Sequence, residues 1–236
     1  MTSMHVRLRR LNKRLRNGTL WKPVSFGSFT EVEPISRDFG FDRGLPIDRH
    51  YIEIFLKKHA GDIQGRVLEI GDASYCRQFG GGRIERQEVL HVHQGAPEAT
   101  IVGDLSQPGV LPADSLDCAV LTQTLHLIYD MKAALIELRR GMKPGGVVLA
   151  TVPGITPVAR DEWGATWYWS LTRIAAERLF GEVFGPANVT VQQFGNVYAA
   201  TAFVQGVATE EVSRAKLDIL DEQYPVILGV RAVRAE

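Results

Sequence analysis

The chain has 236 residues, 45% of them hydrophobic, which is enough for one large domain with a complete core. Its 27 basic and 27 acidic residues balance, so no global field would attract nucleic acid or a membrane surface. Two cysteines form no disulfide framework, no apolar run approaches the ~18 residues of a membrane span, and no secretory signal is evident. We therefore expect a cytoplasmic protein.

The first 30 residues contain seven Lys or Arg side chains and no acid. Leucines three and four residues apart predict a helix over 1–22. Such a segment either contacts an anionic partner or a membrane surface, or is a solvated or frayed terminal helix. We expect residues 1–47 to be a basic helix and loop segment that covers the site of a domain spanning 48–236.

The remaining chain alternates between short apolar runs and amphipathic stretches. In order, the pattern predicts a helix over 48–58, a strand over 66–70, a short and weak helix over 74–79, strands over 87–93, 99–104 and 116–122, a helix over 130–142, a strand over 147–152, a helix over 173–184, a strand over 188–193, a mostly helical stretch over 196–222 and a final strand over 225–235. This alternation predicts a parallel sheet with helices on both faces.

One apolar run, Val67-Leu-Glu-Ile-Gly71, stops at an acid and a glycine and then turns. Glu69 and Gly71 are therefore expected at the carboxyl end of a strand, where open parallel sheets bind ligands. Gly71 has no side chain and would let a ligand approach the backbone closely.

Four segments occur in one order, namely 67–71, Gly103-Asp-Leu105, 117–122 and Met142-Lys-Pro-Gly-Gly146. Together they resemble the motif series of class I S-adenosylmethionine-dependent methyltransferases over about residues 48–152. The resemblance implies S-adenosylmethionine as cofactor and an α/β, Rossmann-like, doubly wound fold. Its seven-stranded sheet would be mostly parallel, with helices on both faces and an antiparallel final strand.

The flanking segments 38–49 and 122–130 resemble a narrower bacterial group encoded near or fused to glycosyltransferases. This association suggests O-methylation of a hydroxyl on a sugar, glycan precursor or glycosylated metabolite. There are two alternatives. The protein methylates a small aromatic or amine natural product, or it is a non-catalytic, methyltransferase-like binding subunit. The expected partner is a small-molecule or glycan acceptor, and the oligomeric state stays open.

The resemblance also assigns residues to the methionine end of the cofactor. Glu69 and Asp72 would orient the methionine ammonium, although Glu69 could instead be a structural acid satisfied by neighbouring backbone amides. Arg49 or Tyr51 would donate to the methionine carboxylate.

The other half of the cofactor would meet the later strand ends. Asp104 would accept from the adenine amino group, unless it only forms a turn, and Leu105 would offer backbone contact. Thr122 and Gln123 would face the sulfonium methyl.

Two features depart from the family pattern. Ala73 and Tyr75 stand where glycines are usual, so Tyr75 either covers the cofactor or shifts the loop. The second strand lacks the usual ribose-binding acid, and His93, Gln94 or water would replace it. His91 and His93 share a strand face, but no third ligand is evident nearby, so we expect no metal.

The catalytic candidates follow the fourth and fifth strands. His126 has the chemistry of a general base, or else it packs at a helix start. Asp161 is the alternative base, in a segment that is either an acceptor site or a hydrophobic lid. The expected acceptor-binding residues are Glu162, Trp163, Trp167 and Tyr168.

Overall fold

The structure is a computed structural model, and it describes residue 27 and residues 31–235. The basic helix predicted over 1–22 lies outside these residues. The chain divides into two compact units, Met1–Pro34 and Ile35–Glu236. The second unit contains every strand and helix discussed below. Among the described residues, no helix is long and apolar enough to cross a membrane.

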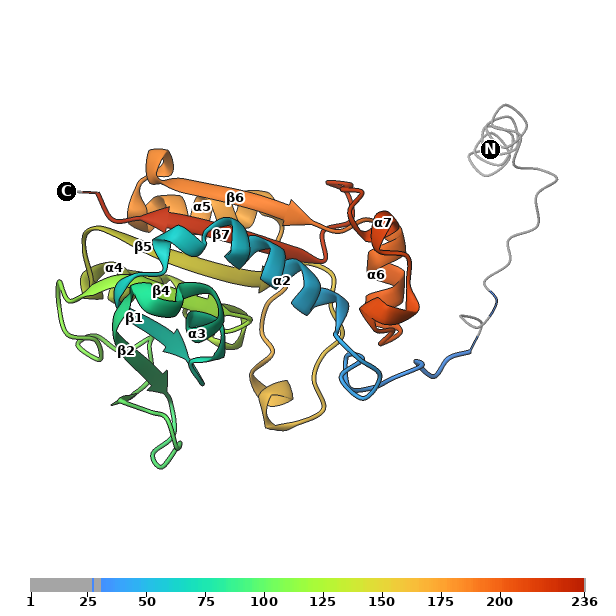
Figure 1. Ribbon diagram of the computed structural model, residues 1–236, viewed down its shortest axis with the longest axis horizontal. Helices are drawn as coiled ribbons and strands as arrows, with labels where there is room; N and C mark the ends of the chain where they lie inside the picture. The colour runs from blue at the N-terminus through green and yellow to red at the C-terminus, as the bar shows by residue number, and fades with distance from the viewer. Residues whose placement is uncertain (1–26, 28–30, 236) are drawn as a thin grey trace, which may run out of the picture. The chain divides into compact units, whose positions relative to one another are not determined.

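A seven-stranded sheet forms the centre of this unit (Figure 1). The strands are β1 (Gly65–Ile70), β2 (Ile84–His91), β3 (Ile101–Val102), β4 (Leu116–Thr122), β5 (Met142–Pro153), β6 (Val189–Phe194) and β7 (Ile227–Val233). Their spatial order is β3-β2-β1-β4-β5-β7-β6. Only β7 runs antiparallel to its neighbours. The predicted fold class is therefore confirmed.

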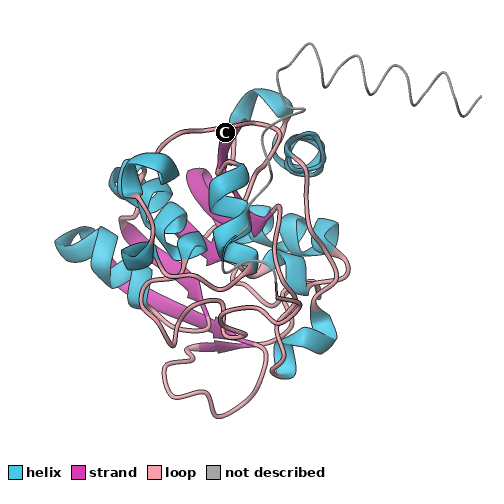
Figure 2. Ribbon diagram, turned by 90° about the vertical axis from the view of Figure 1, so that its right-hand side faces the viewer, coloured by secondary structure: helices cyan, strands magenta, loops and turns pink. Residues whose placement is uncertain are grey.

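Helices lie on both sides of the sheet (Figure 2). They are α2 (Ile47–Lys58), α3 (Ser74–Gly80), α4 (Met131–Gly141), α5 (Arg173–Phe184), α6 (Val197–Val204) and α7 (Arg214–Leu217). The helical stretch predicted over 196–222 was wrong in its middle part. Gly206 ends α6 with φ +68°, a conformation that side chains disfavour, and a Cβ there would lie 2.3 Å from the Ser36 carbonyl oxygen.

Two strand predictions were displaced. The second strand runs over Ile84–His91 instead of 87–93, so His91 is its last residue. The fifth strand begins at Met142, five residues early, because the register shifts between Leu116 and Cys118 of the neighbouring strand. The stretch 143–146 forms a bulge there, with Gly145 at φ +78°.

The core has a layer on each face of the sheet. The helices α4 and α5 pack on the face that includes Leu121 and Val230. On the other face, Phe55 of α2 approaches β7 so closely that a Cβ on Gly229 would lie 2.5 Å from its ring. Strands buried on both faces explain the continuous apolar runs in the sequence.

The segment 35–46 is attached to the region between α6 and α7. The Ser36 amide donates to the Gln205 carbonyl at 3.0 Å, and the Leu45 amide donates to Glu210 Oε2 at 3.0 Å. Arg43 pairs with Glu211. A Cβ on Gly40 would lie 3.0 Å from the Gly206 carbonyl oxygen, so the two backbones are in close contact.

We predict that Gly229→Ala lowers the free energy of unfolding by roughly 1–3 kcal/mol, because the new methyl group collides with Phe55. Urea unfolding would measure this change. Gly82→Ala is the matched control, since a Cβ there meets nothing within 4 Å. Equal stability of the two variants would contradict the close contact between α2 and β7.

Candidate active site

A cavity of about 1220 Å³ opens at the carboxyl ends of the parallel strands. Residues at the carboxyl ends of four different strands line it: 69–72 at the end of β1, 91–93 at the end of β2, 103–106 just after β3 and 122–124 at the end of β4. Pockets for one drug-sized ligand usually measure about 300–1,000 Å³. The cavity is therefore large enough for a cofactor together with part of a second molecule.

Glu69 lies at the cavity wall and is only 2% exposed. Its carboxylate accepts hydrogen bonds from the backbone amides of Tyr75 (3.1 Å) and Cys76 (2.7 Å). Burial raises the pKa of Glu69 to about 7, although the two amides act in the opposite direction. The two backbone amides thus hold Glu69 as expected for a structural acid. Its carboxylate nevertheless remains part of the cavity wall.

Two further residues of the first turn line the cavity. Gly71 has φ +89°, and an added Cβ would meet no protein atom within 4 Å. Its backbone conformation, more than crowding by the protein, therefore favours glycine. The Asp72 carboxylate accepts from the Ser74 amide at 2.7 Å and shapes the start of α3.

The structure separates Arg49 from Tyr51. Arg49 lines the cavity, with its guanidinium 5.6 Å from the centre of the Phe41 ring. Tyr51 is 1% exposed, and its hydroxyl donates to the Leu217 carbonyl at 2.9 Å. Its ring packs 5.8 Å from that of Phe194. Tyr51 is thus a core residue, and the expectation that it reaches the cofactor is not supported.

Tyr75, which stands at a usual glycine position, is part of the cavity wall. Its ring stacks on that of Phe79, with the centroids 6.2 Å apart and the planes at 20°. Burial raises the pKa of the Tyr75 hydroxyl, while the nearby Arg49 guanidinium opposes this rise. The side chain therefore covers one side of the cavity beside Arg49. Ala73 is fully buried beneath the loop.

Asp104 and Leu105 lie together at the far end of the cavity. Asp104 Oδ1 accepts from the Ser106 amide (2.9 Å) and from its hydroxyl (2.8 Å). This arrangement is the turn expected as the alternative role. It places the carboxylate at the cavity, and Leu105 is 4% exposed.

The end of β2 carries imidazoles in place of the usual acid. His91 and His93 line the cavity, whereas Gln94 is not among its lining residues. His91 Nδ1 accepts from the His93 amide at 3.0 Å, so a neutral His91 carries its proton on Nε2. Among the described residues, no group of three or more His, Cys, Asp or Glu side chains could hold a metal.

The backbone is unusual where β4 ends. Thr122 and Gln123 both line the cavity, and Gln123 has φ +49°, a conformation that few residues other than glycine adopt. Its amide donates to the Thr151 carbonyl at 3.0 Å, which helps to hold this conformation. Such strained residues are concentrated at functional sites.

His126 is fully buried at the cavity wall, against the indole of Trp167. The two ring centres are 4.4 Å apart in an edge-to-face arrangement. Burial, with a smaller contribution from the Arg49 charge, lowers the pKa of His126 to about 4. The imidazole is therefore neutral at neutral pH and has one donor and one acceptor nitrogen.

Unpartnered polar atoms are concentrated at this wall. Among the described residues, seven buried side-chain nitrogen or oxygen atoms lack a hydrogen-bond partner. Four of them belong to residues that line the cavity: Gln123 Oε1, both ring nitrogens of His126, and Trp167 Nε1. Buried polar groups are normally paired, so this cluster indicates a place where a ligand makes the hydrogen bonds.

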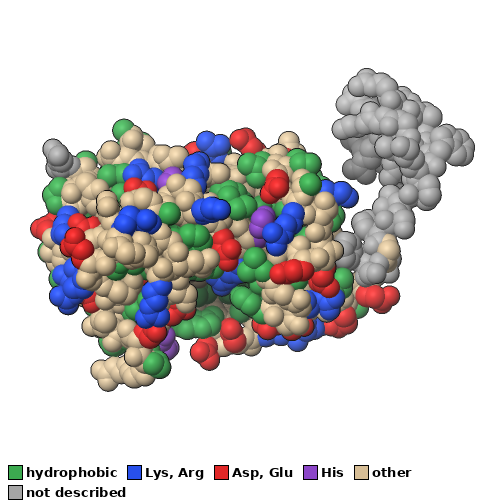
Figure 3. All heavy atoms as spheres, viewed as in Figure 1, with side chains coloured by type: hydrophobic (Ala, Val, Ile, Leu, Met, Phe, Trp, Pro, Cys, Tyr) green, Lys and Arg blue, Asp and Glu red, His purple; other side chains and the backbone are tan. Residues whose placement is uncertain are grey.

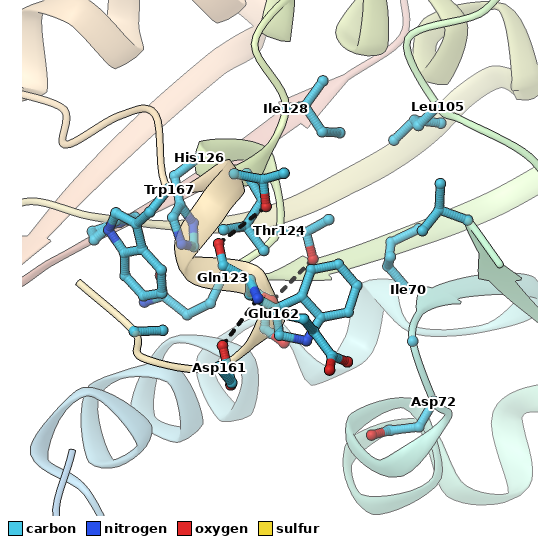
Figure 4. A pocket seen from close by; sticks show the side chains of 18 of the residues that line it. Ile70, Asp72, Leu105, Gln123, Thr124, His126, Ile128, Asp161, Glu162 and Trp167 are labelled. Atoms are coloured by element: carbon cyan, nitrogen blue, oxygen red, sulfur yellow. Dashed lines mark hydrogen bonds between the residues drawn. The ribbon is translucent and has the colours of Figure 1, made fainter. Parts of the chain in front are cut away.

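The segment after β5 supplies the remaining predicted residues. Asp161, Glu162, Trp163, Trp167 and Tyr168 all line the cavity. Asp161 Oδ1 accepts from the Trp163 amide at 3.0 Å, and the Tyr168 amide donates to the His126 carbonyl at 3.1 Å. Figure 4 shows Asp161, Glu162, Gln123, His126 and Trp167 grouped apart from Ile70, Asp72 and Leu105 across the cavity.

Several aromatic residues of the wall were not predicted. Phe39 stacks on Trp167 with ring centres 5.8 Å apart and planes at 15°. Phe41, Tyr129 and Phe203 also line the cavity. The segment 38–49 stood out in the sequence, but loops have no periodicity that shows which side chains point inward.

Charged side chains of both signs are mixed on the face of the molecule that Figure 3 shows. Figure 3 shows Lys, Arg, Asp and Glu side chains interspersed over one face. This mixture agrees with the balanced composition of the chain.

Residues 73–150 match the family model described as a methyltransferase domain. A search of curated protein sequences gave no match. The matched segment begins after the first turn and includes the strand ends that hold Asp104, Gln123 and His126.

Solved structures share the fold. A Mesorhizobium loti S-adenosylmethionine-dependent methyltransferase is 16% identical with a TM-score of 0.52, over 80% of this chain and 98% of that one. An Archaeoglobus fulgidus methyltransferase of the same kind is 12% identical with a TM-score of 0.51, over 78% and 94%. A Haemonchus contortus phosphoethanolamine N-methyltransferase, solved with S-adenosylhomocysteine, is 13% identical with a TM-score of 0.51, over 85% and 60%.

At such low identities the structural similarity shows a common fold and no more. The match of residues 73–150 to a methyltransferase domain indicates the type of enzyme. The predicted cofactor agrees with both. Residues 73–150 thus match a methyltransferase domain, and the described part of the chain has the fold of S-adenosylmethionine-dependent methyltransferases.

Proposed function

We propose that this enzyme methylates a hydroxyl oxygen on a sugar, glycan precursor or glycosylated metabolite. The observation that carries the proposal is the neutral, unpartnered His126 in the same cavity as the expected cofactor residues. Asp161 and Glu162 add carboxylates that accept hydrogen bonds from hydroxyls, and the aromatic side chains beside them suit the apolar faces of sugar rings.

The residues at the strand ends fit the cofactor. Glu69 and Asp72 would meet the methionine ammonium, and Arg49 the methionine carboxylate. Asp104 and Leu105 would meet the adenine, where the second carboxylate oxygen of Asp104 accepts no hydrogen bond from the described residues. His91 would donate to a ribose oxygen in place of the usual acid.

S-adenosylmethionine, when bound, supplies a methyl group on a positively charged sulfur that is already activated for displacement. The protein therefore mainly aligns the acceptor. Thr122 and Gln123 would position the acceptor oxygen, and His126 would accept the hydroxyl proton. An imidazole nitrogen with a pKa of about 4 is basic enough for this role. As the acceptor oxygen forms its bond to the methyl carbon, the hydroxyl proton on that oxygen becomes strongly acidic and is easily transferred.

Trp167 controls access to this nitrogen. In the structure the imidazole nitrogens are covered and the indole lies 4.4 Å away. The acceptor would therefore have to displace the indole before its hydroxyl could reach His126. Residues 38–45 contribute Asp38, Phe39, Phe41 and Leu45 to the same wall, which supports the proposal that the N-terminal segment covers the site.

A small aromatic acceptor is the second candidate. The parallel stack of Phe39 and Trp167 shows that flat rings pack well at this position. Screening methyl transfer from labelled S-adenosylmethionine to methyl glycosides and to phenols would separate the two acceptor classes. If the purified protein failed to bind S-adenosylmethionine in calorimetry, both would be excluded and a non-catalytic binding subunit would remain.

Asp104→Ala should weaken S-adenosylmethionine binding by roughly 1–3 kcal/mol, because the adenine amino group loses its acceptor. Titration calorimetry would measure the change. Asp221→Ala is a matched control, since Asp221 likewise accepts from the amide two residues on but does not line this cavity. Unchanged affinity in Asp104→Ala would show that the adenine lies elsewhere.

Cofactor affinity should fall as the pH drops below about 7. Glu69 must be ionised to attract the ammonium, and its pKa is about 7 in the folded protein, so protonation below that pH removes the attraction. We expect up to about a tenfold loss per pH unit between pH 7 and 5.5. Calorimetry on Glu69→Gln should show little of this slope, and an equal slope in both proteins would rule out the role.

His126→Gln should reduce turnover strongly while cofactor affinity changes little, because glutamine forms hydrogen bonds but accepts no proton. In the wild type, with S-adenosylmethionine kept saturating at every pH, kcat/KM for the acceptor should hold down to about pH 5 and decline near pH 4, where the imidazole becomes charged. Release of S-adenosylhomocysteine would report the rate. His59→Gln, outside the cavity, is the control, and normal turnover of His126→Gln would leave Asp161 or no base.

A further inference from the structure

The four unpartnered polar atoms at the cavity wall are covered in this structure, and they become a recognition surface once the Trp167 indole shifts to admit the acceptor. They lie on two segments, with Gln123 and His126 after β4 and Trp167 after β5. Trp167 and His126 are in contact, and the Tyr168 amide ties the second segment to the His126 carbonyl. The remaining three unpartnered atoms, on His50, Gln87 and Gln205, do not line this cavity.

All three side chains of this surface are neutral. Gln123 Oε1 and one nitrogen of His126 need a hydrogen-bond donor, while Trp167 Nε1 and the other His126 nitrogen need an acceptor. A carboxylate or phosphate would supply acceptors alone, and an ammonium would supply donors alone. A single hydroxyl supplies one donor and would leave Gln123 or His126 unpaired.

Two neighbouring hydroxyls match the requirement. Each supplies one donor and at least one acceptor, so together they provide partners for Gln123 Oε1, for Trp167 Nε1 and for the acceptor nitrogen of His126, the one ring nitrogen that a hydroxyl on this side reaches. The rings of Phe39, Trp167 and Phe203 surround this surface, which suits a ring-shaped carrier with an apolar face.

We propose that the acceptor presents a vicinal diol on a ring to Gln123, His126 and Trp167. The hydroxyl that receives the methyl group lies against His126, and its neighbour lies between Gln123 and Trp167. This inference rests on the proposed O-methylation and names the group that the same site recognises. The carrier ring is saturated, as in a sugar, or aromatic, as in a catechol.

Recognition of a diol also predicts that each acceptor molecule is methylated only once. A methyl ether keeps its acceptor lone pairs but has lost its donor hydrogen. The product would therefore leave one acceptor of the surface unpaired again, and it would bind less tightly than the substrate. We expect the enzyme to transfer one methyl group to each diol.

Four small probes test the proposal on the full chain with S-adenosylhomocysteine present. They are cis-1,2-cyclohexanediol, cyclohexanol, catechol and phenol, and ligand-observed NMR titration measures their affinities. At least one diol should bind about tenfold more tightly than the mono-ol of the same ring, since one lost polar partner commonly has this effect. The ring whose diol binds more tightly identifies the carrier.

Trp167→Phe keeps an aromatic ring but removes the indole N–H. It should abolish the preference for the diol, so that the diol and the mono-ol of the same ring bind with equal affinity. Trp169→Phe is the matched control, because Trp169 Nε1 already donates to the Ile128 carbonyl at 3.2 Å and Trp169 does not line the cavity. Calorimetry with S-adenosylhomocysteine verifies that both variants are folded.

Equal binding of diols and mono-ols, or an unchanged diol preference in Trp167→Phe, would overturn the proposal. The proposed methylation fails separately, if S-adenosylmethionine does not bind or if no hydroxyl acceptor is methylated. A second series of titrations without S-adenosylhomocysteine keeps the diol preference measurable in that case.

Discussion

The site depends on the alignment of parallel strands. Hydrogen bonding pairs Ile70 with Leu90 and Thr122 with Thr151, so neighbouring strands end at the same edge of the sheet. The residues just beyond those ends must leave the ladder, and their backbones become free to bind a ligand. Gly71 and Gln123 leave the extended strand conformation in this way, and both have a positive φ. The buried sheet thus determines where the cavity lies, and the loops determine what it recognises.

The sheet and most of its helices could be predicted from the sequence because burial and periodicity are local properties. The strand ends carrying Glu69, Asp104 and Gln123 followed from the same patterns. Tyr51 shows the limit: an aromatic residue on a helix is equally suited to a core and to a binding site, and only the packing against Phe194 decides. Phe39 was missed because loops have no such periodicity.

Burial changes the pKa values of His126 and Glu69, which both line the cavity, in opposite directions. It lowers the pKa of His126 to about 4 and raises that of Glu69 to about 7, in each case because it disfavours the charged form. His126 is therefore uncharged where an acceptor hydroxyl would bind. Glu69 is near its titration point where the cationic end of the cofactor would bind. One physical effect thus prepares two different environments.

The contact between Gly40 and Gly206 has a consequence for the order in which the protein becomes functional during synthesis. The strands that surround the cofactor residues are complete once β5 has left the ribosome, but the segment that carries Phe39 cannot make its backbone contact with Gly206 until the chain beyond α6 exists. A nascent chain could therefore form the cofactor half of the cavity early. The acceptor wall would be completed only when nearly the whole chain has been translated.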